Sequence, residues 1–279
     1  MCDYKKLLEN ENTTFKNWLE KKKGINFDEL NEENFKKCFP LAFQDAFGQY
    51  CRRKGKKYKE GLDKFFEVDF SKFYAEKIEK FKNGAEESKP KFEDIVNYLK
   101  PHIKNIIKSD IKEESEEDIS YGLLQKVTGM ILKYLYCFDD VKDLSDYYMP
   151  LDSFILSWYK NCEIQNLDDN IKQEHERLCK NIKNWTNLSE DDFEGVQKNI
   201  LAILTNENYK YVIKFDDKNY TIPLSKKRLE AEFVIWRYEQ LKKDFNDVHS
   251  IKEKGYFNIE ISLKKEYFSA PYIFNNIIN

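Results

Sequence analysis

The segment Tyr121-Gly-Leu-Leu-Gln-Lys-Val-Thr-Gly-Met-Ile-Leu-Lys-Tyr-Leu-Tyr-Cys-Phe138 is the most apolar stretch of the chain. Its pattern is that of a helix, and apolar residues cover nearly every side of that helix. Its only formal charges are Lys126 and Lys133. A helix of this kind is usually buried, so the sequence predicts a central helix that carries two lysines into an apolar environment.

The two lysines are seven residues apart, which is close to two helical turns. Their ammonium groups should therefore project from one face about 10 Å apart along the helix axis, with Met130 between them. Burying two like charges costs several kcal/mol unless a carboxylate compensates them or one lysine stays neutral. An apolar site lowers the pKa of a lysine, and a neutral lysine is a nucleophile, as in enzymes that form a Schiff base. The alternative is that both side chains extend from a half-buried helix to water.

Asp152 is the expected compensating carboxylate. It follows Met149-Pro150-Leu151 and comes directly before an apolar helix predicted to begin at Ser153. Pro150 fixes the approach of the chain to that helix. Asp152 can therefore cap the helix, point towards the lysines, or do both.

The rest of the chain favours a mainly α fold with a small β element near the C-terminus. Pro40 should break or kink one of the predicted helices, and Pro101 should interrupt another. A β-hairpin with a four-residue turn is expected from residues 209–215 and 220–224, and a further strand from 256–263. Helices are expected over residues 12–20, 32–53, 65–81, 92–108, 121–138 and 229–245, and from a helix that starts over 153–159 helices are expected to continue through Trp185 to about Leu204.

Length and charge limit the possible functions. The chain has 279 residues, which is enough for one large domain or two small ones. Lys and Arg number 47 and Asp and Glu number 50, giving a formal charge of −3. A strongly basic nucleic-acid binder is therefore not indicated, and any basic surface must be local. We find no apolar run long enough to span a membrane and no secretory signal, so we expect a cytoplasmic protein with no membrane partner.

Several classes of site are not indicated. The six cysteines are scattered and are expected to be reduced thiols. The three histidines are isolated and have no metal-ligand spacing. The sequence has no Walker loop, dinucleotide fingerprint or Ser-His-Asp arrangement. We therefore expect neither a metal nor another cofactor.

A basic stretch is the candidate for binding phosphate. Six cations occur within eight residues, interleaved with Gly55 and Tyr58, and they are Arg52, Arg53, Lys54, Lys56, Lys57 and Lys59. Such a cluster is suited to DNA phosphates, although a solvated loop in a lysine-rich protein is an equal alternative. On the preceding phenylalanine-rich helix, Gln44 and Gln49 are candidates for amide contacts to a base.

The order of these elements resembles the helix-hairpin-helix DNA glycosylases, and more narrowly the archaeal 8-oxoguanine DNA glycosylase family. Lys126-Val, Lys133-Tyr-Leu-Tyr and Pro150-Leu-Asp152 match three active-site elements of that family in order. The match covers roughly residues 120–160. The Gly-x-Gly hairpin of most relatives is absent, Gly122 alone remaining, and the predicted β-hairpin is an additional element.

The resemblance implies a fold of two helical lobes and a reaction that excises a base. A monomer would bind double-stranded DNA and flip the target nucleotide into a pocket between the lobes. A lysine would attack C1′ while the aspartate stabilises positive charge on the sugar, and β-elimination would then nick the strand. The family pattern makes Lys126 the first candidate for the nucleophile, with Lys133 close behind.

The resemblance also implies base-binding residues and an organisation of the chain. Trp236 would stack on the flipped base and Glu232 would bind its polar edge, with Pro150 also beside the base. The implied units are an N-terminal helical lobe over residues 1–110, a catalytic lobe over 111–205, and a hairpin with a helix over 206–279. The excised base is expected to be an oxidised purine or a bulky modified base such as one carried by viral DNA.

Two other functions remain open from the sequence. The first is a non-catalytic DNA-binding or interaction module that keeps the same fold with a dead pocket. The second is a helical protein whose acidic and basic stretches pair with a protein partner and need no nucleic acid. A role in repair and a role in defence are equally compatible with the residues.

Overall fold

The computed structural model describes residues 15–253 except residues 18, 21–23, 55, 84–88, 110–118, 142–143, 145, 163, 165–166, 216–217 and 223. Within this part the protein is mainly helical, as the sequence predicted, and it has two short antiparallel strand pairs. The strand predicted at residues 256–263 lies outside the described residues. None of the described helices is both long and apolar enough to cross a membrane.

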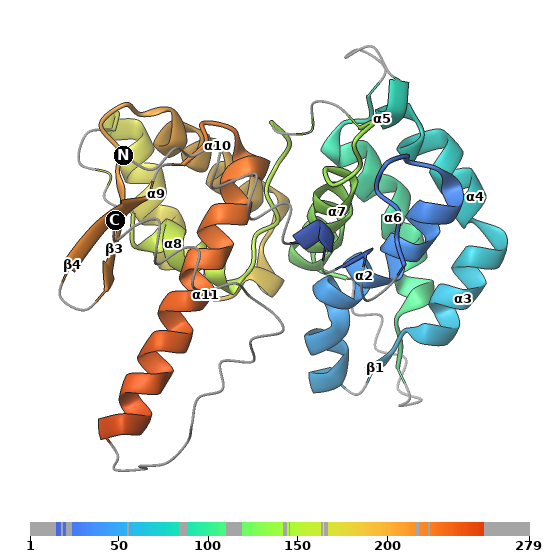
Figure 1. The fold of residues 1–279 in the computed structure, drawn as a ribbon, viewed down its shortest axis with the longest axis horizontal. Coiled ribbons are helices and arrows are strands. Elements are labelled where there is room, and N and C mark those ends of the chain that lie inside the picture. The colour runs from blue at the N-terminus through green and yellow to red at the C-terminus, as the bar shows by residue number, and fades with distance from the viewer. Residues whose placement is uncertain are drawn as a thin grey trace.

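Helices from the N-terminal half of the chain form one group (Figure 1). The helix predicted over residues 65–81 is divided between three helices and a π-helical turn, η1. The elements of this group are α2 (Glu32–Lys54), β1 (Lys56–Lys57), α3 (Lys59–Val68), α4 (Phe70–Phe73), η1 (Tyr74–Ile78), α5 (Lys80–Asn83), α6 (Phe92–Ile106), β2 (Lys108–Ser109) and α7 (Tyr121–Leu135).

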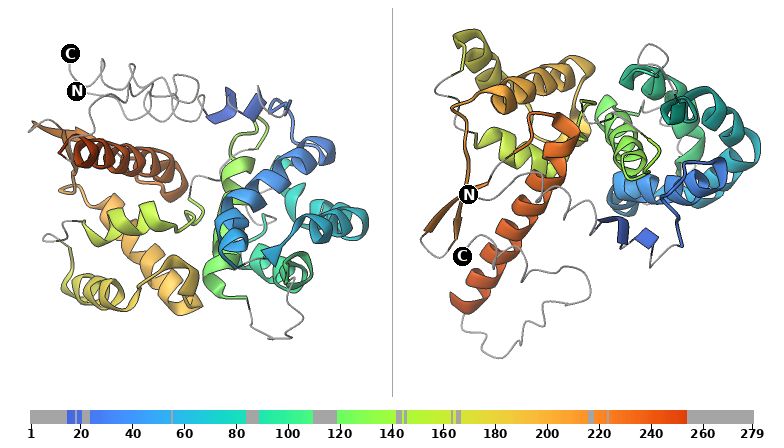
Figure 2. Two further views of the ribbon diagram at one scale, coloured as in Figure 1. Left: turned by 90° about the horizontal axis from the view of Figure 1, so that it is seen from below. Right: turned by 45° about the horizontal axis from the view of Figure 1, so that its top comes forward.

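The remaining elements lie together on the other side of the molecule, and Figure 2 shows the same grouping from two further directions. They are α8 (Ser153–Lys160), α9 (Asp169–Asn181), the 3-10 helix η3 (Trp185–Asn187), α10 (Glu190–Thr205), β3 (Tyr211–Phe215), β4 (Lys218–Ile222) and α11 (Arg228–Glu253). Helix α11 packs on α8, and its first half faces the group that contains α7.

Helix α7 is the buried helix that its sequence predicted. Every residue from Gly122 to Leu135 is buried. Its main neighbour is α2, and it also packs on α6 and η3. A Cβ at Gly122 would collide with the backbone carbonyl of Trp185, so only glycine allows η3 to approach α7 this closely.

The prediction that Pro101 would interrupt a helix was wrong, and Pro40 does not break its helix. Helix α2 continues through Pro40 and α6 continues through Pro101. A proline inside a helix costs about 3 kcal/mol because a hydrogen bond is lost. Burial of one large apolar side chain stabilises a fold by about 1.5–3 kcal/mol. In α2, four phenylalanines are fully buried, namely Phe35, Phe39, Phe43 and Phe47. Tertiary burial therefore outweighs the local preference of proline.

The strands differ from the prediction in two details. Pairing of β3 with β4 extends to Phe215 opposite Lys218, so two residues separate the strands rather than four. The pair β1–β2 was not predicted, and it joins Lys56 to Ser109 and Lys57 to Lys108. The basic stretch is therefore the end of α2 followed by a short strand, not a loop.

Candidate active site

Lys126 and Lys133 are both buried on α7, with side chains that are 6% and 7% exposed. The alternative in which both extend to water is therefore wrong. Each ammonium group has a carboxylate of its own. Lys126 Nζ lies 2.9 Å from Asp152 Oδ2, and Lys133 Nζ lies 2.7 Å from Glu232 Oε2. The cost of burying the two charges is thus met by pairing each with an opposite charge.

Asp152 combines the two roles that the sequence left open. Its Oδ1 caps α8 by accepting hydrogen bonds from the backbone N–H groups of Phe154 and Ile155, at 2.9 and 3.0 Å. Its Oδ2 accepts from Lys126 Nζ and from Trp236 Nε1, at 2.9 and 3.1 Å. Burial opposes ionisation of this carboxyl, but the charge and hydrogen bond of Lys126 and the Ile155 N–H hold its pKa below the usual value. Asp152 is therefore an anion at neutral pH.

The loop that carries Asp152 is fixed by two buried amides. Gln125 accepts from Leu151 N at 3.0 Å and donates to Leu151 O at 2.9 Å. Gln197 accepts from Met149 N at 3.3 Å and donates to Met149 O at 2.7 Å. These paired hydrogen bonds fix the backbone of the loop at Met149 and Leu151, the residues on either side of Pro150.

Pro150 lies directly against α7 at Gly129. A Cβ on that glycine would lie 2.6 Å from Pro150 Cβ and 2.8 Å from Pro150 Cα, closer than such atoms can approach. The absence of a side chain at Gly129 therefore allows the loop to reach the lysine face of the helix. The glycine stands three residues after Lys126, so the close approach occurs within one turn of that lysine.

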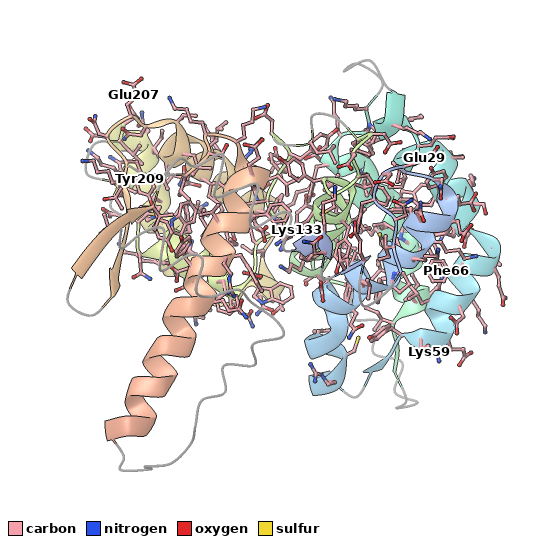
Figure 3. All side chains as sticks on the ribbon, viewed as in Figure 1. Glu29, Lys59, Phe66, Lys133, Glu207 and Tyr209 are labelled. Carbon is pink, nitrogen blue, oxygen red and sulfur yellow. The ribbon has the colours of Figure 1, made fainter. Side chains whose placement is uncertain are left out.

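The second ion pair lies among aromatic rings. Lys133 Nζ is 4.6 Å from the ring centroid of Phe233, 5.3 Å from that of Trp236 and 5.5 Å from that of Phe15. The Glu232 side chain is 1% exposed, and burial raises its pKa despite the opposing charge of Lys133. Apart from the ion pair, its two oxygens have no hydrogen-bond partner among the described residues. Figure 3 shows Lys133 between α7 and α11, where the two groups of helices meet.

Asp45 on α2 is a site residue that the sequence did not reveal. Its Oδ2 accepts a hydrogen bond from Tyr134 Oη at 2.9 Å. The residue as a whole is exposed, but the surrounding protein desolvates its carboxylate, and this raises the pKa. The Tyr134 hydrogen bond and the charges of Lys126 and Lys133 lower the pKa of Asp45 by a smaller amount. No local motif marks Asp45, because it reaches the lysines only through the packing of α2 on α7. The neighbouring Gln44, a predicted base contact, is exposed on the same helix.

The phosphate-binding prediction stays a prediction. Arg52 is exposed, and its Nε donates to the carbonyl of Gly48 at 3.3 Å. Lys59 is exposed at the start of α3. The other cations are Arg53 and Lys54 at the end of α2, and Lys56 and Lys57 in β1. Their side chains, and that of Gln49, lie outside the part that the structure describes.

The structure thus brings six predicted residues to one place, namely Lys126, Lys133, Pro150, Asp152, Glu232 and Trp236. Comparisons of the chain with protein-family models, with curated proteins and with solved structures found no match. Functional inference therefore depends on the residues and on their geometry. A buried amine beside an ionised carboxylate is the arrangement from which that inference starts.

Proposed function

We propose that the protein is a DNA glycosylase with AP-lyase activity that excises a damaged or modified base through Lys126. The observation that carries the proposal is the 2.9 Å contact between Lys126 Nζ and Asp152 Oδ2 in a buried site. A primary amine can form a covalent imine with a sugar carbon, and an adjacent carboxylate can stabilise the cation that develops there.

We assign the attack to Lys126, because its ionised carboxylate can accept the lysine proton and then stabilise positive charge on the sugar. It shares its carboxylate with a helix N-terminus and with Trp236, and that carboxylate is ionised. Lys133 is instead paired with a carboxyl whose pKa is raised and is surrounded by three rings. This setting suits the recognition of a ligand more than attack on one, because the Glu232 oxygens have unused acceptor capacity.

The proposed reaction follows from these roles. Lys126 first passes a proton to Asp152 Oδ2, which lies 2.9 Å from its Nζ, and the Nζ lone pair then forms a bond to C1′. The bond from C1′ to the base breaks, its electron pair leaves with the base, and the base takes the proton from Asp152, which becomes an anion again. Asp152 stabilises the positive charge that develops on the sugar during this exchange. Opening of the sugar ring gives an imine, and loss of a C2′ proton then expels the 3′ phosphate.

Base recognition is assigned to Glu232 and Trp236. A buried carboxylate accepts hydrogen bonds from N–H groups on the edge of a flipped base, and an indole ring stacks on its face. The burial of both lysines requires the nucleotide to leave the duplex before it can react. An oxidised purine or a bulky modified base remains the proposed substrate, and double-stranded DNA the proposed partner.

Borohydride trapping tests the proposal. The wild type is incubated with duplexes that carry oxidised, deaminated, alkylated or hypermodified bases, and covalent adducts are resolved by denaturing electrophoresis. Lys126→Arg keeps the positive charge beside Asp152 but cannot form the imine, so we expect no adduct. Lys133→Arg is the matched control, because it keeps Lys126 and should still be trapped.

Two results would contradict the proposal. An adduct that persists in Lys126→Arg and disappears in Lys133→Arg would make Lys133 the nucleophile. Salt-sensitive DNA binding with no adduct on any of the duplexes would instead support a non-catalytic binding module. Circular dichroism of each variant tests whether the fold is retained.

A further inference from the structure

Trp236 contacts both ion pairs. Its Nε1 donates to Asp152 Oδ2 at 3.1 Å, and the centroid of its ring lies 5.3 Å from Lys133 Nζ. The ring also packs edge-on against Phe154, with centroids 5.7 Å apart and planes at 79°. These contacts fix both the N–H direction and the plane of the indole.

The Asp152 carboxylate is held by four donors. Two backbone N–H groups hold Oδ1, and among the described residues Lys126 and Trp236 are the side chains that donate to Oδ2. In the proposed reaction, Lys126 becomes bonded to the sugar and ceases to be a free ammonium group. Of the two side-chain donors on Oδ2, the indole N–H is the one that the reaction leaves in place.

We infer that Trp236 is a positioning residue, whose indole N–H keeps Asp152 oriented towards the sugar after Lys126 has been consumed. This inference rests on the proposed function, and it adds a role distinct from stacking on the base. Stacking needs only the ring, whereas this role needs the N–H group. The two roles therefore separate when the ring is kept and the N–H is removed.

The charged groups around Asp152 come from three helices. Lys126 and Lys133 face it from α7, and Glu232 faces it from α11. Asp45 on α2 interacts with the same two lysines. A substitution that tests the indole N–H must leave these four groups unchanged, and replacement of Trp236 by phenylalanine does so.

The test compares Trp236→Phe with Trp158→Phe. Both variants lose one hydrogen-bonded indole N–H, but Trp158 donates to Tyr209 Oη at 3.0 Å, away from the two ion pairs. The first measurement is a carbon-13 NMR titration of the Asp152 carboxyl group in the free protein. We expect its pKa to rise by about one unit in Trp236→Phe, because a hydrogen bond to an ionised carboxylate has about this effect. No rise is expected in Trp158→Phe.

The second measurement is the pH dependence of borohydride trapping. We expect the acidic limb of the profile to move to higher pH by a similar amount in Trp236→Phe and to stay in place in Trp158→Phe. An unchanged Asp152 titration, or an acidic limb that does not move, would overturn the inference. A wild type that forms no adduct at any pH would refute the proposed function, whereas the titration would still decide whether the indole holds the carboxylate.

Discussion

Removing the charge of Glu232 should destabilise the protein strongly, because Lys133 would be left buried without its carboxylate. The substitution Glu232→Gln keeps the size of the side chain. The Lys133 side chain is only 7% exposed, and its Nζ lies 2.7 Å from the carboxylate that would be lost. Three aromatic rings around the ammonium group would not replace the missing negative charge.

The expected magnitude follows from the burial of both partners. Breaking a buried ion pair by removing one partner typically costs about 3–5 kcal/mol. In proteins of about 150–250 residues each kcal/mol lowers the melting temperature by roughly 2–4 °C, so for this chain of 279 residues we expect a fall of at most roughly 6–20 °C. The exposed pair formed by Lys72 and Glu76 supplies the control, since Glu76→Gln should cost less than about 1 kcal/mol.

The double substitution Lys133→Met with Glu232→Gln should recover most of this loss. Methionine keeps the contacts with the surrounding rings and has no charge to compensate. Replacement of a buried ion pair by neutral side chains is often neutral or stabilising by about 1–4 kcal/mol. We therefore expect the free energy of unfolding of the double variant to lie within about 1 kcal/mol of the wild-type value, or to exceed it.

The single variant Lys133→Met should show a distinctive pH dependence. Burial raises the pKa of Glu232 even though the positive charge of Lys133 lowers it. In Lys133→Met that opposing charge is absent, so the pKa of Glu232 should rise further. A carboxyl with a raised pKa in the folded state takes up a proton there before the unfolded state does. Stability relative to the wild type should therefore increase as the pH falls from 8 to 5.

Urea unfolding followed by circular dichroism measures the four free energies of unfolding. The difference between the double variant and the sum of the two single variants gives the coupling energy. Single substitutions that each cost less than about 1 kcal/mol and add without coupling would refute the reasoning. That outcome would mean that Lys133 reaches solvent or another charge.

Two further predictions concern the loop and the cap that hold Asp152. Gly129→Ala should destabilise the protein by about 1–3 kcal/mol in urea unfolding, because the new Cβ would press on Pro150. Gly48→Ala is the control, because the atom nearest to its Cβ would be 3.6 Å away, and it should be neutral or stabilising. Equal effects of the two substitutions would contradict the close approach of Pro150 to Gly129. Asp152→Asn should lose stability at pH 7, but the deficit should shrink as the pH falls below about 4, because a carboxyl with a lowered pKa stabilises the fold only above its titration range. A deficit that stays constant from pH 7 to pH 3 would show that Asp152 is not held as an anion.

The sequence indicated which charged residues gather at the site better than it indicated how they are paired. Two lysines in an apolar helix and an aspartate before the next helix could be found from spacing alone, and the structure brings Lys126 to Asp152. Which carboxylate pairs with Lys133 depends on how α11 lies across α7, and such packing has no local signal. The same limit hid Asp45, whose contact with Tyr134 joins two helices 89 residues apart in the chain.

Local rules failed where burial overrides them. Pro40 was expected to break or kink one helix and Pro101 to interrupt another, but the apolar faces of α2 and α6 keep both helices continuous. The hairpin was predicted correctly as an element, whereas its turn was two residues too long because the pairing continues to Lys218. Periodicity therefore located the elements, and tertiary contacts determined their ends.

The position of α11 along the chain has a consequence for biosynthesis. Lys133 is translated about a hundred residues before Glu232 and Trp236, with which the structure places it in contact. A nascent polypeptide that stops short of α11 lacks Glu232 and two of the three aromatic rings that surround Lys133. Emergence of α11 from the ribosome should therefore be the event that stabilises the centre of the molecule, and truncated products should be readily degraded by proteases.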